Sequence, residues 1–166
     1  MLEADLTLYE EDARRLTAVL HKLCEDAKSR AVFLIDKAGQ LIASAGETGS
    51  VDTTSLASLT AGNIAATSGL AQLLGEKGFS VLFHEGEKDN LHISIVARRG
   101  ILVVLFDSRS SLGLVRLRVK RASEDIGQVF AEIAARAEQE AGRGKATLQA
   151  QFSEITDEDI DNLFKG

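Results

Sequence analysis

Proline is absent from the 166 residues, and cysteine occurs only once, as Cys24. A chain without proline has no rigid proline-rich linker and no turn that depends on a proline ring. A single cysteine excludes an internal disulfide, and Cys24 lies on the apolar side of a helical pattern, which favours a packed core thiol over a nucleophile. No apolar run approaches the roughly 18 residues that a membrane-spanning helix needs. With this length, the composition indicates one globular core.

Charge of either sign is moderate, and acidic residues prevail. Lys and Arg number 19 and Asp and Glu 25, so the formal net charge is −6. This balance argues against a general nucleic-acid-binding protein, which needs a basic excess for its phosphate contacts. Near the start of the chain, Glu3 and Asp5 occupy positions where a signal peptide carries basic residues, so we expect a cytoplasmic protein.

The motifs of metal and nucleophilic chemistry are missing. His21, His84 and His92 have no metal-ligand spacing with one another or with Cys24, and neither a GxSxG nor an HExxH sequence occurs. The dipeptide Gly144-Lys145 is followed by alanine and has no glycine five residues earlier, so it does not form a phosphate-binding loop. We therefore expect structural histidines, no metal, no cofactor and no catalytic residue.

Basic residues occur in the turn before the last predicted strand, at 101–106, and in the segment that follows this strand. Arg98, Arg99 and Arg109 lie in predicted loops, where an arginine either is solvated or enters the active site of a partner GTPase as an arginine finger. The helix that follows carries a basic strip, which either is solvated or meets an acidic partner, and it consists of Arg116, Arg118, Lys120 and Arg121.

Helical and strand patterns alternate along the chain. The predicted elements are a helix within 3–28, strands at 30–35 and 41–46, a helix between 52 and 75, strands at 78–84, 91–97 and 101–106, and a long helix from 112 to about 141. Short connections between neighbours favour an antiparallel five-stranded sheet in an α+β fold. The central helix is then expected on one face of the sheet and the two terminal helices on the other.

The central helix has two unlike faces and no charged residue after Asp52. Asp52 or Thr53 is suited to cap its start, and Gly75 its end. We expect the core to receive a leucine face, made of Leu56, Leu59, Leu70, Leu73 and Leu74. The opposite face is nearly smooth backbone and suits another protein surface at close range, and it consists of Ser58, Ala61, Gly62, Ala65, Ser68, Gly69 and Gln72. Burial of both faces in one core is the alternative.

The C-terminal part of the chain is expected to be separate from the domain at 1–141. Residues 142–151 lose the helical period and are predicted to be a flexible linker. Residues 152–166 carry a net charge of −4 and are predicted to form a short amphipathic helix capped at Thr156. The helix after this cap is far below the ~12 to 15 residues that hold a helix in water, so it needs a partner. Its docking residues are Phe152, Ile155, Ile160, Leu163 and Phe164. The alternative is a solubilising tail.

Three motifs resemble those of one family. They are Val-Phe-Leu-Ile-Asp-Lys-Ala-Gly-Gln at 32–40, Thr-Thr-Ser-Leu-Ala-Ser-Leu-Thr-Ala-Gly-Asn at 53–63, and Leu-Gly-Leu-Val-Arg at 112–116. With the order of helices and strands, they resemble the Roadblock family of dynein light chains and GTPase regulators, over about residues 9–136. Within that family, the chain is similar to the bacterial regulators of gliding motility and cell polarity, and the tail at 155–164 is similar to that of some members.

The resemblance implies a homodimer built through the central helices and the strand after them. It also implies a GTPase-activating partner of a Ras-like small GTPase of the MglA type, located in the cytoplasm and concentrated at a cell pole. In that family the GTPase brings its own arginine and glutamine, and the regulator reshapes the switch regions. A Roadblock-type scaffold that binds without changing the hydrolysis rate is the alternative, and an enzyme in its own right comes third.

Overall fold

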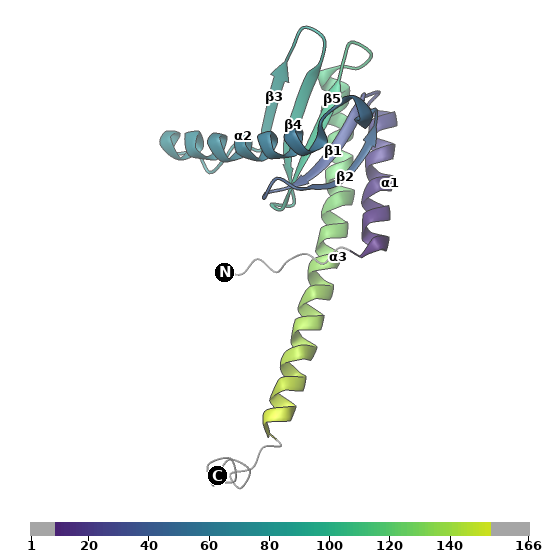
Figure 1. Cartoon of the computed structure of the whole chain (residues 1–166). Coiled ribbons are helices and arrows are strands. Elements are labelled where there is room, and N and C mark those ends of the chain that lie inside the picture. Colours follow the sequence, from purple (N-terminus) through teal and green to yellow (C-terminus); the bar gives the residue numbers. More distant parts are fainter. Residues whose placement is uncertain (1–8, 154–166) are drawn as a thin grey trace. The chain divides into compact units, whose positions relative to one another are not determined.

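The computed structural model describes residues 9–153, with side chains as far as residue 151, and it has the predicted order of elements (Figure 1). The helices are α1 (Glu10–Asp26), α2 (Thr53–Leu74) and α3 (Leu112–Ser153), with a short 3₁₀ turn, η1 (Thr48–Ser50). The strands are β1 (Ala31–Asp36), β2 (Leu41–Gly46), β3 (Val81–Glu85), β4 (Asn90–Val96) and β5 (Gly100–Phe106). All strand pairs are antiparallel, in the spatial order β2-β1-β5-β4-β3. The predicted five-stranded sheet is confirmed.

The two central strands, β1 and β5, are apolar on both faces because both faces are covered. Side chains alternate along a strand, so Phe33 and Leu34 point to opposite sides of the sheet. Phe33 belongs to a buried cluster that includes Ala57 of α2. On the other side lie α1 and the first half of α3, whose Phe130 approaches Gly100 of β5 (Figure 1). The prediction of one helix on one face and two on the other is confirmed.

The predicted leucine face of α2 does not form the core. Exposed fractions are 74% for Leu59, 57% for Leu70, 83% for Leu73 and 69% for Leu74, and only Leu56 packs against the core. The core cluster instead receives Ala57, with Leu56, Ala61 and Ile64 packed against it, and the small side chain of Ala57 lets the helix lie close to the strands. Figure 1 shows the last turns of α2 extending past β3, where no strand lies beneath them. The prediction was wrong because Leu59 and Leu73 lie nearly opposite the buried Ala57, and because the last turns of the helix, with Leu70, Leu73 and Leu74, extend beyond the sheet.

The predicted end of the last helix near residue 141 is also wrong. Helix α3 continues to Ser153, so residues 142–151 are helical and not irregular. Gly142 and Gly144 each weaken a helix by about 1 kcal/mol relative to alanine, but without proline nothing breaks the hydrogen-bond ladder, and the neighbouring Ala, Gln, Lys and Leu residues favour it. The functional division of the chain into domain, linker and tail stays a prediction.

Within the described residues, 9–130 form one compact unit, and the part of α3 from Ala131 onward belongs to another. Within that second part, residues 138–151 are exposed along the whole helix. The predicted docking residues Phe152, Ile155, Ile160, Leu163 and Phe164 lie outside the part of the chain whose side chains are described. Among the described helices, none combines the length and the apolar character that crossing a bilayer requires.

Candidate interaction surface of the central helix

Helix α2 begins and ends as its sequence predicts. The carboxylate of Asp52 accepts hydrogen bonds from the backbone N–H of Ser55 at 3.2 Å and from its hydroxyl at 2.7 Å. The bond from the Ser55 hydroxyl is the main reason that the pKa of Asp52 lies below its ordinary value. Gly75 ends the helix in the left-handed conformation, with φ of 73°. The caps enclose 22 residues without a single charge.

The exposed side of α2 divides into an outer strip and two flanks. At about 100° per residue, Leu59 and Leu73 lie nearly opposite the buried Ala57. Leu70 and Leu74 turn toward one flank, so the four exposed leucines run along the outside of the helix. The other flank carries small residues and is described next. An exposed leucine strip on a helix without charge is suited to contact with another protein.

Five of the seven predicted contact residues lie together on the second flank. They are Ser58, Gly62, Ala65, Gly69 and Gln72, all of them exposed, and we call them the small-residue flank. Ala61 is half-buried and packs against the core cluster beneath this flank. The hydroxyl of Ser68 is exposed but donates to the carbonyl of Ile64 at 3.0 Å in its own helix. The structure therefore brings most of the predicted set together and leaves Ala61 out of reach.

The glycines of this flank have no role in packing the protomer. A Cβ added to Gly62 or Gly69 would meet no atom within 4 Å. Alanine would stabilise the helix by about 1 kcal/mol at each position, so the protomer by itself gives no reason for glycine. Close approach of a second backbone to the flank is a physical reason for both.

Strand β3 carries exposed apolar side chains on the face of the sheet away from α2, because Leu82, between Val81 and Phe83, packs on the α2 side. It forms one edge of the sheet, and Val81 and Phe83 are 43% and 36% exposed. The ring of Phe83 stacks on Phe106 with centroids 6.1 Å apart, and His84 meets the side-chain amide of Asn63 on α2 at 3.3 Å. An edge strand with unpaired backbone groups and apolar side chains is a surface on which another strand can pair. Sequence analysis placed these residues in a strand but did not single them out.

Of the three arginines suggested as possible fingers, Arg109 pairs with acidic neighbours beside Arg30, and the other two are exposed. Arg109 donates to Asp107 at 3.0 Å and lies 3.8 Å from Glu47, while Arg30 holds Asp89 with one nitrogen at 2.8 Å from both carboxylate oxygens. These hydrogen bonds raise the pKa of both guanidinium groups and lower that of Asp107. Arg98 and Arg99 lie exposed in the turn between β4 and β5.

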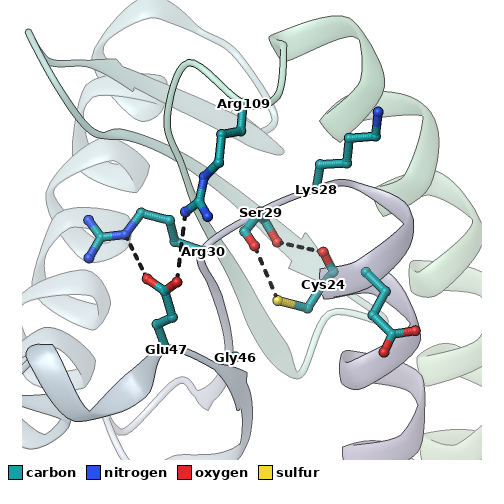
Figure 2. A pocket seen from close by; sticks show the side chains of 8 residues that line it. Cys24, Lys28, Ser29, Arg30, Gly46, Glu47 and Arg109 are labelled. Carbon is teal, nitrogen blue, oxygen red and sulfur yellow. Dashed lines mark hydrogen bonds and ion pairs between the residues drawn. The ribbon is translucent and has the colours of Figure 1, made fainter.

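Figure 2 shows Arg109 beside a shallow cavity of about 450 Å³ at the end of α1, with Arg30, Glu47 and Cys24 also on its wall. Cys24 is buried, with its thiol 3.5 Å from the carbonyl oxygen of Ser29, as its place in the helical pattern predicts. Arg109 pairs with Asp107 and Glu47, and Glu47 also pairs with Arg30, so this arginine is not free to extend into a partner.

The described residues contain no group of three His, Cys, Asp or Glu side chains that is arranged to hold a metal ion. His21 is exposed on α1, and His84 contacts Asn63. His92 is buried on β4, and burial, followed by the nearby charge of Arg116, lowers its pKa below the ordinary value.

An antiparallel five-stranded sheet, with one helix on one face and two on the other, is the architecture that the family resemblance of the motifs above implies. The chain belongs to the Roadblock/LC7 domain family, whose model matches residues 16–106. It is 55% identical to the solved MglB of Myxococcus xanthus, covering 76% of this chain and 96% of that one with a TM-score of 0.73. The Thermus thermophilus gliding protein MglB is 35% identical, over 79% and 99% of the two chains, with a TM-score of 0.72. An uncharacterised protein of Methanocaldococcus jannaschii, MJ1340, is 32% identical over 68% of this chain and 96% of its own.

Proposed function

We propose that this chain is a GTPase-activating regulator of a Ras-like small GTPase of the MglA type, acting as a homodimer in bacterial cell polarity and gliding motility. The observation that carries the proposal is the uncharged, exposed small-residue flank of α2, where two glycines leave backbone open to close approach. Similarity to two MglB structures, one of them named a gliding protein, supports the same function. The regulator works in the cytoplasm, concentrated at a cell pole, and supplies no catalytic group.

The homodimer forms through the leucine strip of α2 and the edge strand β3. Fully burying a leucine side chain contributes about 1.5 to 3 kcal/mol. A twofold interface buries the same leucines from both protomers, so each of them contributes once from each protomer. Eight exposed leucines in a dimer, four from each protomer, therefore outweigh an association cost on the order of 10 kcal/mol. Pairing of two β3 edges satisfies the backbone groups that the single sheet leaves open.

At micromolar concentration, sedimentation velocity should find a dimer, and Leu73→Glu should shift it to a monomer. Leu73 is 83% exposed in the protomer, so the substitution leaves the fold intact and places a charge in the interface. Leu117→Glu is the matched control, because Leu117 is 62% exposed on α3, away from the interface. A monomeric parent protein, or equal dissociation of both variants, would refute this interface.

The GTPase sits on the small-residue flank, where a switch segment can approach the helix backbone. Activation proceeds by holding the switch regions of the GTPase in a competent arrangement, with catalytic residues of the GTPase itself. The pairing of Arg109 with Asp107 and Glu47 supports this mechanism over an arginine finger at that position. The C-terminal segment at 152–166, with its net charge of −4, binds a second, basic surface of the GTPase and adjusts affinity or nucleotide exchange.

Single-turnover GTP hydrolysis by the cognate GTPase should be accelerated by at least about tenfold when the full chain is added. A chain ending at residue 151 should reach the same maximal rate but need a higher concentration, and the difference should shrink at high salt because charge attraction is screened. Binding without any acceleration would favour the scaffold function instead. Identical concentration dependence and nucleotide exchange for both chains would show that the tail only solubilises the protein.

A further inference from the structure

A second cavity lies on the face of the sheet away from α2. It occupies about 620 Å³ between strands β3 and β4 and the first turns of α3. His92 and Ser94 form its wall on β4, and they point away from the α2 side because their neighbour Ile93 belongs to the core cluster on that side. Its size is in the range of sites for small molecules.

Two buried polar atoms at this cavity have no hydrogen-bond partner. Among the described residues, none bonds Nδ1 of His92 or the hydroxyl of Ser94, although the two side chains are only 2% and 5% exposed. Native proteins satisfy nearly all such atoms, and those that stay unpaired call for an explanation. Both residues line the same cavity, so one ligand in it can bond to both.

The lining of the cavity on α3 carries a net positive charge. Arg116 and Lys120 stand one helical turn apart on α3, and within the described residues neither has an ion-pair partner. Two like charges at this spacing repel, and an anion between them relieves the repulsion. Glu124 is the only acidic residue of the lining, so the wall has a net charge of +1.

The rest of the lining includes apolar side chains, among them Val81 and Val119, together with the hydroxyls of Ser80 and Ser123. We propose that this cavity binds a small molecule that carries a phosphate or carboxylate group on an apolar body. The anionic group lies between Arg116 and Lys120, and the Ser94 hydroxyl and His92 imidazole bond the ligand deeper in the cavity. The site lies on the sheet face away from α2, and it does not depend on the proposed regulation of a GTPase.

The test uses the full chain and three probes, which are phenyl phosphate, benzoate and inorganic phosphate. We expect saturable binding of phenyl phosphate in the millimolar range or tighter by calorimetry, with a shift of the His92 imidazole signals in ¹H–¹⁵N spectra. Comparison with benzoate separates phosphate from carboxylate as the preferred group. Inorganic phosphate should bind at least about fivefold more weakly than phenyl phosphate, because it lacks the apolar body. Equal binding of these two would overturn the apolar part of the proposal.

The double variant Arg116→Ala with Lys120→Ala should weaken binding by about tenfold or more, since charge-assisted hydrogen bonds are lost. The matched control is Arg118→Ala with Arg121→Ala, which removes the same charge from exposed positions of α3 that do not line the cavity. Ser94→Ala should weaken binding about fivefold, and Glu124→Gln should strengthen it. The proposal would be overturned if the two double variants lost the same binding affinity, or if Ser94→Ala bound the probe as tightly as the parent chain. The absence of a saturable shift of the His92 signals with every probe would also overturn it.

Discussion

Replacing Ala65 and Gly69 together by arginine is expected to abolish binding of the GTPase, with a loss of about 100-fold or more in affinity. Both positions are exposed on the small-residue flank, and a Cβ at Gly69 meets nothing within 4 Å, so the protomer accommodates the new side chains. In the complex, two long charged side chains one turn apart would block close approach and lose their hydration without a partner. Affinity is measured by titration with the GTPase in its GTP-bound form.

The control for this experiment is Ala18→Arg with His21→Arg. Both residues are exposed on α1, which lies on the opposite face of the sheet, and the formal charge changes by the same two units. Sedimentation and thermal unfolding should show the same dimer and stability for both double variants. If the Ala65 and Gly69 variant binds the GTPase with unchanged affinity while remaining a folded dimer, the GTPase site lies elsewhere on the molecule.

Gly46→Ala should lower the free energy of unfolding by about 2 to 5 kcal/mol. Gly46 ends β2 with φ of 87°, a conformation that costs other residues about 1 to 2 kcal/mol. A Cβ there would also collide with the carbonyl oxygen of Arg30 and come within 2.8 Å of the Cys24 thiol, and overpacking of this kind costs about 1 to 3 kcal/mol. The carbonyl of Arg30 belongs to the backbone, so the clash cannot be relieved by rotating one side chain.

Urea unfolding at constant protein concentration measures this loss, because dimerisation would otherwise change the apparent stability. Gly49→Ala, in the turn that follows, is the matched control, since its Cβ would meet nothing within 4 Å and its effect should stay within about 0.5 kcal/mol. A loss below about 1 kcal/mol for Gly46→Ala would mean that the backbone of Arg30 can move away at little cost.

Sequence patterns predicted the candidate site in part. Helical spacing and the absence of charge predicted a contact face of seven residues on α2. Five of these seven lie together and exposed, and they form the small-residue flank. Ala61 packs against the core, because a position at the border between two helix faces turns inward or outward according to what lies beside it. The cavity near His92 could not be predicted, since strand alternation places this residue on a polar face but does not say that α3 leaves a gap there.

The sequence by itself determined the order and type of the elements, the antiparallel sheet and the caps of α2. These features depend on interactions between residues close in the sequence. Examples are the repeat of apolar side chains, the hydrogen bond that the Asp52 carboxylate accepts from the Ser55 N–H, and the left-handed backbone conformation of Gly75. Only the tertiary structure decided which side of α2 meets the sheet, because a helix without charge has two sides that are both compatible with burial. Ala57 packs in the core cluster because its small side chain allows close approach to the strands. Leu59 and Leu73 stay exposed because they lie nearly opposite Ala57, and the last turns of the helix extend past the edge strand.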